Sequence, residues 1–183
     1  KTMDYEGAGT VEFILDKDGS FYFLEMNTRL QVEHPVTEMV TGFDLVDLQV
    51  RVAQGEQLTF KQEEIIQKGH AIEVRLYAEN PDKDFMPSVG KIAYVGESRL
   101  IGVRLDTGYQ DGNEVTVSFD PMLAKLIVWS SDRVSAISKM EKALCDYPFL
   151  GLTTNRDYLS RILKHPRFRE GLTYTHFVKT YEE

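Results

Sequence analysis

The chain has 183 residues, 42% of them hydrophobic and 27% charged, which suits one or two folded domains and excludes a disordered chain. Its net charge of −8 argues against a nucleic-acid partner, because an acidic surface repels phosphate backbones. No apolar run approaches the roughly 20 residues that span a bilayer, so no membrane role is expected. A single cysteine, Cys145, excludes an internal disulfide and fits a reducing compartment.

Two alternating stretches predict an antiparallel hairpin near the start of the chain. Thr10–Leu15 (TVEFIL) and Phe21–Met26 (FYFLEM) are rich in β-branched and aromatic residues. The polar residues 16–20 between them include Gly19, which suits the positive φ of a tight turn.

Helices are predicted after the hairpin. Pro35 disfavours helix at the residue before it, so residues 27–34 are expected to be extended or looped, followed by a short helix over residues 36–42. Asp44 is a typical N-cap for a second helix that ends near Gly55.

The remaining sequence predicts a sheet followed by helices. Gly69–Glu79 alternates strongly, which places Val74 and Leu76 on one face of a strand and Arg75 on the other. Further elements are expected as strands near 90–95, 101–106, 114–118 and 123–129, a helix after Asp132 with Ala136, Ile137, Met140 and Leu144 inward, a helix at Asn155–Lys164, and a short tail at 166–183. Mostly antiparallel strands with grouped helices indicate an α+β fold, with a domain boundary near residue 66.

Three oxygen-bearing side chains are predicted to meet on the hairpin. Glu25 and Asn27 are two residues apart and share a strand face, and counting across the turn places Glu12 opposite Leu24 or Glu25. Carboxylates that close repel each other unless a cation lies between them, and this donor set suits Mg²⁺ or Mn²⁺.

The alternative for the hairpin is a pair of solvated surface glutamates. Phe13, Phe23 and Leu24 flank the acidic residues and predict that the hairpin is largely covered. Carboxylates on a covered hairpin need a partner, which favours the metal site.

Polar and apolar residues also alternate directly after the hairpin. If this segment is extended, Arg29, Gln31 and Glu33 point the same way, between Leu30 and Val32. The guanidinium of Arg29 suits a small planar oxyanion such as bicarbonate, and Glu33 is a candidate general base. A simple Arg29–Glu33 ion pair on a loop stays open as an alternative.

The residue after this segment, His34, is less informative. A structural, hydrogen-bonded histidine is the preferred interpretation there.

Several blocks together resemble the biotin carboxylase branch of the ATP-grasp superfamily. The most specific is Glu25–Glu38 (EMNTRLQVEHPVTE), because other ATP-grasp ligases keep a Glu-x-Asn but not the following Arg-x-Gln-x-Glu-His. Supporting blocks are Gly7–Phe13 (GAGTVEF), Gly69–Arg75 (GHAIEVR), Asp120–Leu126 (DPMLAKL) and Gly151–Asn155 (GLTTN). The resemblance covers essentially the whole chain and is greatest to the α subunits of acyl-CoA carboxylases.

The resemblance implies a metal and nucleotide site on the hairpin. Glu12, Glu25 and Asn27 would hold Mg²⁺ or Mn²⁺, and the two glutamates would also face the phosphates of ATP. Ile14 and Leu152 would border the adenine.

The resemblance also implies a bicarbonate and biotin site. Arg29 would bind bicarbonate, Gln31 and the backbone N–H of Val32 would complete the pocket, and Glu33 would remove the bicarbonate proton. Arg75 would meet the ureido oxygen of biotin.

In such an enzyme, residues 1–66 would end an ATP-grasp domain and residues 67–183 would form the biotin carboxylase C-terminal domain. The implied partners are a biotin carboxyl carrier domain, a carboxyltransferase component and a second copy or larger complex, in the cytoplasm or, in a eukaryote, the mitochondrial matrix. Because the chain starts at Lys1 and lacks the family's glycine-rich lid and ATP-binding lysines, it is interpreted as a piece of a larger protein, inactive alone.

Two alternative functions would need fewer of these residues. A non-catalytic dimerisation or docking module would not need the clustered charges of Glu12, Glu25, Arg29 and Arg75. A different ATP-grasp ligase, joining a carboxylate to an amine, would not need Arg75 or the run that follows Arg29.

Overall fold

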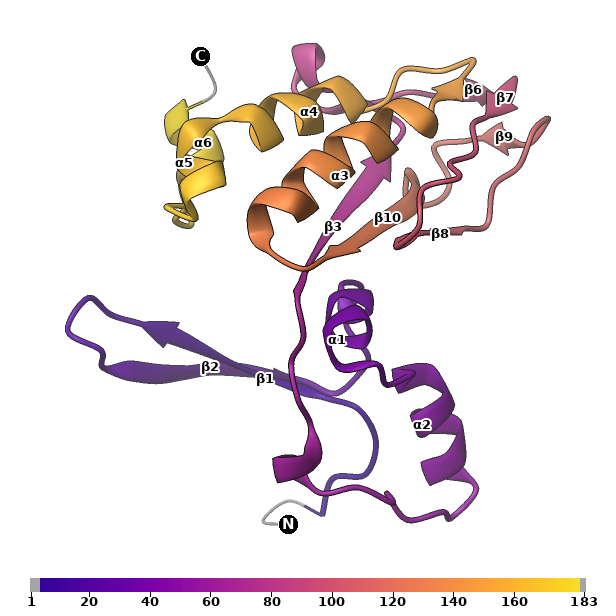
Figure 1. The fold of residues 1–183 in the computed structure, drawn as a ribbon. Coiled ribbons are helices and arrows are strands. Elements are labelled where there is room, and N and C mark those ends of the chain that lie inside the picture. Colours follow the sequence, from indigo (N-terminus) through magenta and orange to yellow (C-terminus); the bar gives the residue numbers. More distant parts are fainter. Residues whose placement is uncertain (1–3, 182–183) are drawn as a thin grey trace. The chain divides into compact units, whose positions relative to one another are not determined.

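The computed structural model describes residues 4–181, so the predicted start at Lys1 lies outside the described residues. The chain divides between Lys68 and Gly69 into two compact units, called here the N-terminal unit and the C-terminal unit. Figure 1 shows the helices and antiparallel sheets of both units, which confirms the α+β class.

The predicted hairpin opens the N-terminal unit. Strand β1 (Thr10–Leu15) pairs antiparallel with β2 (Phe21–Asn27), and the register shifts at a bulge after Glu12. The turn closes with a hydrogen bond of 2.8 Å from Asp16 N to Ser20 O, and Gly19 has the expected positive φ of 85°.

The prediction that the hairpin is covered was wrong. Phe13, Phe23 and Leu24 are all exposed, with 65% of Phe23 accessible. Both faces of this two-stranded ribbon carry large apolar side chains, and a ribbon of two strands cannot bury both of its own faces. Burial of the hairpin therefore gives no reason, in this chain, why its carboxylates should need a positively charged partner.

The helix predicted over residues 36–42 begins earlier. Helix α1 spans His34–Thr41, because Pro35 occupies the first turn, where its missing N–H costs no hydrogen bond. Gly42, with φ of 80°, ends the helix by donating its N–H to Glu38 O at 2.8 Å.

The second helix of this unit has the predicted cap. Helix α2 spans Leu45–Ala53, and Oδ1 of Asp44 accepts from the N–H of Asp47 at 2.8 Å. The buried Glu38 carboxylate accepts from the N–H of Leu45 at 2.7 Å, which links α1 to the start of α2. A 3-10 turn, η1 (Gln62–Glu64), follows in the connecting segment.

A three-stranded antiparallel sheet, in the order β3-β10-β8, forms the centre of the C-terminal unit. Its strands are β3 (His70–Tyr77), β10 (Met122–Ser130) and β8 (Val103–Thr107). Helix α3 (Arg133–Asp146), capped by Asp132 as predicted, packs on β3 and β10 (Figure 1). The core between them includes Ile72, Val74, Leu76, Ala78, Ala124, Leu126, Val128, Ala136, Ile137, Met140 and Leu144. The predicted inward faces of the strand and the helix are therefore confirmed.

Short elements surround this layer. The predicted strand at 90–95 is split in two, the predicted strand at 114–118 keeps two residues, and the tail contains two helices that the sequence did not predict. The short elements are β4 (Glu79–Asn80), η2 (Pro81–Lys83), β5 (Met86–Pro87), β6 (Gly90–Lys91), β7 (Tyr94–Val95), β9 (Glu114–Val115), β11 (Phe149–Leu150), α4 (Arg156–Lys164), α5 (Pro166–Glu170) and α6 (Phe177–Tyr181).

Replacing Gly151 with alanine should destabilise the C-terminal unit by about 2 kcal/mol or more. Gly151 has a φ of 106°, and an added Cβ would overlap the carbonyl oxygen of Lys91 and lie 2.9 Å from Ala93 N. The single tryptophan, Trp129 in β10, reports on this unit, so urea unfolding followed by its fluorescence measures the change.

The matched control is Gly112→Ala. Gly112 also has a positive φ, 87°, but an added Cβ there would meet only the flexible Lys91 side chain at 3.9 Å. It should cost about 1 kcal/mol from backbone strain alone. Equal losses in the two variants would contradict the steric argument.

Candidate active site

Three polar side chains converge on one face of the hairpin. The register places Glu12 opposite Glu25, one of the two partners that the sequence predicted, and Thr10 opposite Asn27. Nδ2 of Asn27 donates to Oε1 of Glu12 at 2.6 Å and more weakly to Oε1 of Glu25 at 3.4 Å. A single amide group therefore bridges two carboxylates from different strands.

This arrangement fits a divalent cation. The N–H group of Asn27 lies between two negative charges, where it supplies the partial positive charge that keeps them together. A half-turn of the amide would bring Oδ1 to the same place, since the two ends of an amide have nearly the same shape. Glu12, Glu25 and Asn27 would then offer three oxygens, the donor type that Mg²⁺ and Mn²⁺ prefer.

The described residues offer no competing metal cluster. Across residues 4–181, no group of three or more His, Cys, Asp and Glu side chains is arranged to hold a metal ion. The hairpin set has two carboxylates and an amide, so nucleotide phosphates and water would have to supply the remaining ligands.

Arg29 is joined to the same cluster. Its Nη2 donates to Oδ1 of Asn27 at 3.4 Å, and its Nη1 donates to Oε1 of Gln31 at 3.1 Å and to the carbonyl of Leu30 at 3.3 Å. The Arg29 side chain is exposed. The amide of Asn27 thus contacts both acids through its nitrogen and the guanidinium through its oxygen.

The segment at residues 27–34, expected to be extended or looped, forms a turn after Gln31, so the common face that an extended chain would give Arg29, Gln31 and Glu33 ends there. Val32 and Glu33 form a turn, in which the N–H of His34 donates to Gln31 O at 3.2 Å and leads into α1. Glu33 is the N-cap residue of α1, with φ of −85° and ψ of 11° and no side-chain cap hydrogen bond. Alternation therefore does not place Glu33 beside Arg29, although both side chains are exposed.

The interpretation of His34 as a structural residue is confirmed. Its Nδ1 lies 2.7 Å from the carbonyl oxygen of Gln31, and the ring is half-buried. This bond and the backbone bond of His34 end on the same carbonyl, which fixes the turn that carries Gln31 and Val32.

Arg75 lies in the C-terminal unit, on the face of β3 opposite the core. The register places it beside Lys125 of β10, which in turn lies beside Asp106 of β8. Lys125 Nζ is 3.5 Å from Asp106 Oδ2, and Arg104 Nε is 2.6 Å from Asp106 Oδ1. Burial alone would raise the pKa of Asp106, but Arg104 and Lys125 hold that pKa below its ordinary value of 3.8. The carboxylate therefore stays ionised and offsets the lysine beside Arg75.

The two residues predicted to border adenine lie in different units. Ile14, on β1, is 55% exposed. Leu152 follows β11 and is half-buried against the core of the C-terminal unit.

The structure adds one residue that the sequence did not single out for a role. Asn155 is 6% exposed, and its side chain bonds the backbone of β3 at Arg75 and Tyr77. Arg75 and Asn155 also line a common cavity of about 340 Å³ between β3 and α4. The sequence signal was its place in the GLTTN block, although an asparagine before a helix is ordinarily explained as a helix cap.

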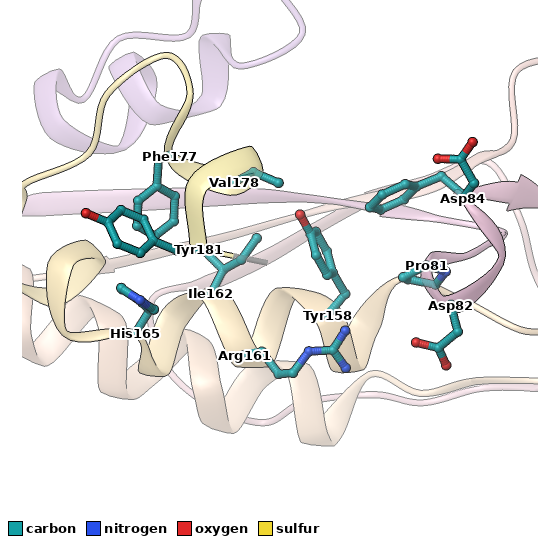
Figure 2. Close-up of a pocket in the computed structure, with 11 residues that line it drawn as sticks. Pro81, Asp82, Asp84, Tyr158, Arg161, Ile162, His165, Phe177, Val178 and Tyr181 are labelled. Atoms are coloured by element: carbon teal, nitrogen blue, oxygen red, sulfur yellow. The ribbon is translucent and has the colours of Figure 1, made fainter. Parts of the chain in front are cut away.

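A larger cavity, of about 680 Å³, contains none of the predicted site residues. It is lined by aromatic side chains of α4 and α6, including Tyr158, Phe177 and Tyr181, with Arg161 and His165 nearby (Figure 2).

None of the helices in residues 4–181 has the length and apolar character that crossing a membrane would require.

Two family models match the chain. Residues 73–180 match the biotin carboxylase C-terminal domain, and residues 1–61 match the ATP-binding domain of the carbamoyl-phosphate synthase L chain. These matches confirm the resemblance predicted from the sequence.

Curated relatives align with nearly all of this chain. It is 52% identical to the alpha subunit of the mitochondrial methylcrotonoyl-CoA carboxylase of Mus musculus, covering 97% of this chain and 25% of that protein. It is 51% identical to one of the pyruvate carboxylase subunits of Methanothermobacter thermautotrophicus (98% and 36%) and 47% identical to a biotin carboxylase of Nostoc sp. (97% and 40%). The chain thus spans between a quarter and two fifths of these relatives' length.

Solved structures agree with these relatives. The biotin carboxylase domain dimer of the Hydrogenobacter thermophilus 2-oxoglutarate carboxylase, described in complex with MgADP, ADP and bicarbonate, matches with a TM-score of 0.93 and 43% identity, covering 96% of this chain and 39% of that chain. The biotin carboxylase subunit of a pyruvate carboxylase matches with the same TM-score, identity and coverage.

Proposed function

We propose a function from the premise that this chain belongs to the biotin carboxylase family. The chain would work as part of a longer enzyme that uses ATP and bicarbonate to carboxylate biotin on a carrier domain. The N-terminal unit would end an ATP-grasp domain, and the C-terminal unit would be the biotin carboxylase C-terminal domain. Because the chain covers only part of its relatives, it would need the rest of that enzyme for activity.

The hairpin would hold the metal and the phosphates of ATP. Glu12, Glu25 and Asn27 would bind Mg²⁺ or Mn²⁺, which would offset the charge on the phosphates during transfer. Their convergence on one amide supports this role. Ile14 and Leu152 would border the adenine.

The segment after the hairpin would bind bicarbonate. Arg29 would hold the anion through its guanidinium, with Gln31 and the N–H of Val32 completing the pocket. The contact of Arg29 Nη1 with Oε1 of Gln31 supports this role, because it orients the guanidinium before a ligand arrives. Glu33 would remove the bicarbonate proton. For this, the Glu33 carboxylate would have to reach the bicarbonate across the turn at the start of α1.

The chemistry would then proceed in two stages. Bicarbonate, deprotonated by Glu33, would attack the γ-phosphate of ATP, forming carboxyphosphate and releasing ADP. Carboxyphosphate would break down to CO₂ and phosphate, and phosphate would take the N1′ proton of biotin. Arg75 would stabilise the negative ureido oxygen while N1′ forms its bond to CO₂. A stiff central strand is a suitable support for that cation.

The partners would be those of a carboxylase. A biotin carboxyl carrier domain would bring biotin, a carboxyltransferase component would consume carboxybiotin, and the enzyme would act as a dimer or larger complex. The relative from Hydrogenobacter thermophilus is described as a domain dimer, which supports the last point. The expected compartment is the cytoplasm, or the mitochondrial matrix in a eukaryote.

The observation that carries the proposal is the Asn27 amide, which joins two acids of the hairpin to the guanidinium of Arg29. The test uses the complete protein that contains this chain. ATP hydrolysis should depend on bicarbonate and should be stimulated by free biotin. Bicarbonate-independent hydrolysis, or no response to biotin, would instead favour an ATP-grasp ligase that joins a carboxylate to an amine.

A further inference from the structure

Asn155 binds β3 in the way that a neighbouring strand would. Its Oδ1 accepts from the N–H of Tyr77 at 2.9 Å, its Nδ2 donates to the carbonyl of Arg75 at 3.0 Å, and its own N–H donates to the carbonyl of Tyr77 at 3.1 Å. Among the described residues, β10 is the only strand paired with β3. Asn155 therefore satisfies the backbone on the other edge of β3, on either side of Leu76.

Asn155 gives up a stabilising contact to do this. It is the N-cap residue of α4, a position where asparagine usually accepts a hydrogen bond from the first turn of its helix, yet it makes no such bond. The hydroxyl of Thr154 makes only a long contact, 3.4 Å, with the N–H of Arg156. A buried amide directed away from its own helix indicates a requirement at β3.

The requirement is the position of one backbone segment. Val74 and Leu76 are buried in the core, which leaves the side chain of Arg75 on the opposite face. Hydrogen bonds from β10 on one edge and from Asn155 on the other fix the segment that carries this side chain. A cation that must meet a developing charge acts best when its support is fixed beforehand.

We propose that Asn155 is a positioning residue, which sets the guanidinium of Arg75 for the ureido oxygen of biotin. This inference rests on the proposed function, because it assumes the role given to Arg75. It adds a residue, 80 positions along the chain, on which the biotin step depends.

The test is Asn155→Ala in the complete protein, with free biotin as the varied substrate. The KM for biotin should rise, or the biotin-stimulated rate should fall, by about 10- to 100-fold, because a displacement near 1 Å is enough to misalign the charge. Bicarbonate-dependent ATP hydrolysis without biotin should stay within about twofold of the original. Asn155→Ser is the second variant: serine restores a helix cap but is too short to bridge Arg75 and Tyr77, so the same biotin defect is expected.

A control and a double variant separate the outcomes. Leu163→Ala, at a buried position of the same helix, should lower stability without a selective biotin defect. In an Arg75→Ala background, Asn155→Ala should add no further biotin defect, since coupled residues are not additive. Equal loss of all activities in both Asn155 variants, or full additivity, would overturn the inference. If Arg75→Ala leaves biotin stimulation intact, the proposed function of Arg75 fails instead.

Discussion

Replacing Arg29 with alanine in the complete protein should lower bicarbonate-dependent ATP hydrolysis by about 10²- to 10³-fold, the usual effect of removing one oriented donor from a charged transition state. The guanidinium is held by Gln31 Oε1 and the carbonyl of Leu30, so alanine removes a preoriented cation. The affinity for ATP should change little. Steady-state kinetics with varied bicarbonate, beside a nucleotide-binding titration, measure the two effects separately.

The control for this variant is Arg51→Ala. Arg51 lies on α2 of the same unit and forms an exposed ion pair with Glu56 at 2.7 Å. The Arg51→Ala substitution removes the same charge from the N-terminal unit but should leave the kinetics unchanged, because exposed ion pairs contribute little to stability. Equal losses of ATP affinity and of turnover in Arg29→Ala would count against a bicarbonate role.

Replacing Glu25 with glutamine should weaken Mn²⁺ binding in the presence of ATP by about 10- to 100-fold or more. Even the substitution of a residue that only hydrogen-bonds to a metal ligand typically lowers metal affinity by that factor. Glutamine keeps the shape of the side chain but removes one of the two charges bridged by Asn27. Electron paramagnetic resonance of bound Mn²⁺ in the complete protein gives the affinity without depending on activity.

Glu56→Gln is the matched variant for Glu25→Gln. It makes the same charge change at an exposed position of the N-terminal unit. Mn²⁺ affinity should be unaltered there, because a surface carboxylate outside the cluster is screened by solvent. If both substitutions weaken Mn²⁺ binding equally, net charge rather than the hairpin geometry controls the metal.

Local patterns were sufficient for much of this fold. The alternation of TVEFIL and FYFLEM predicted two paired strands, and the five-residue turn between them predicted the register to within one residue, because the length of a hairpin loop sets which residues face each other. The helix after Asp132 was equally well determined, since its cap and its apolar spacing agree.

Patterns failed where a residue serves two elements or lies at an element's end. Pro35 was expected to disfavour helix at His34, yet Pro35 occupies the first turn of α1, which begins at His34. The aromatic residues of the hairpin, such as Phe23, were expected to be covered, and composition alone cannot say whether a neighbouring layer exists.

The sequence by itself determined the family, the α+β class and the set of candidate ligands, because these depend on residue types at short, fixed spacings. The tertiary structure decided that Asn27 joins Glu12 to Arg29 and that Asn155 bonds β3 at Arg75. Such contacts depend on side-chain direction and on partners far along the chain, and both are set only when the backbone has folded.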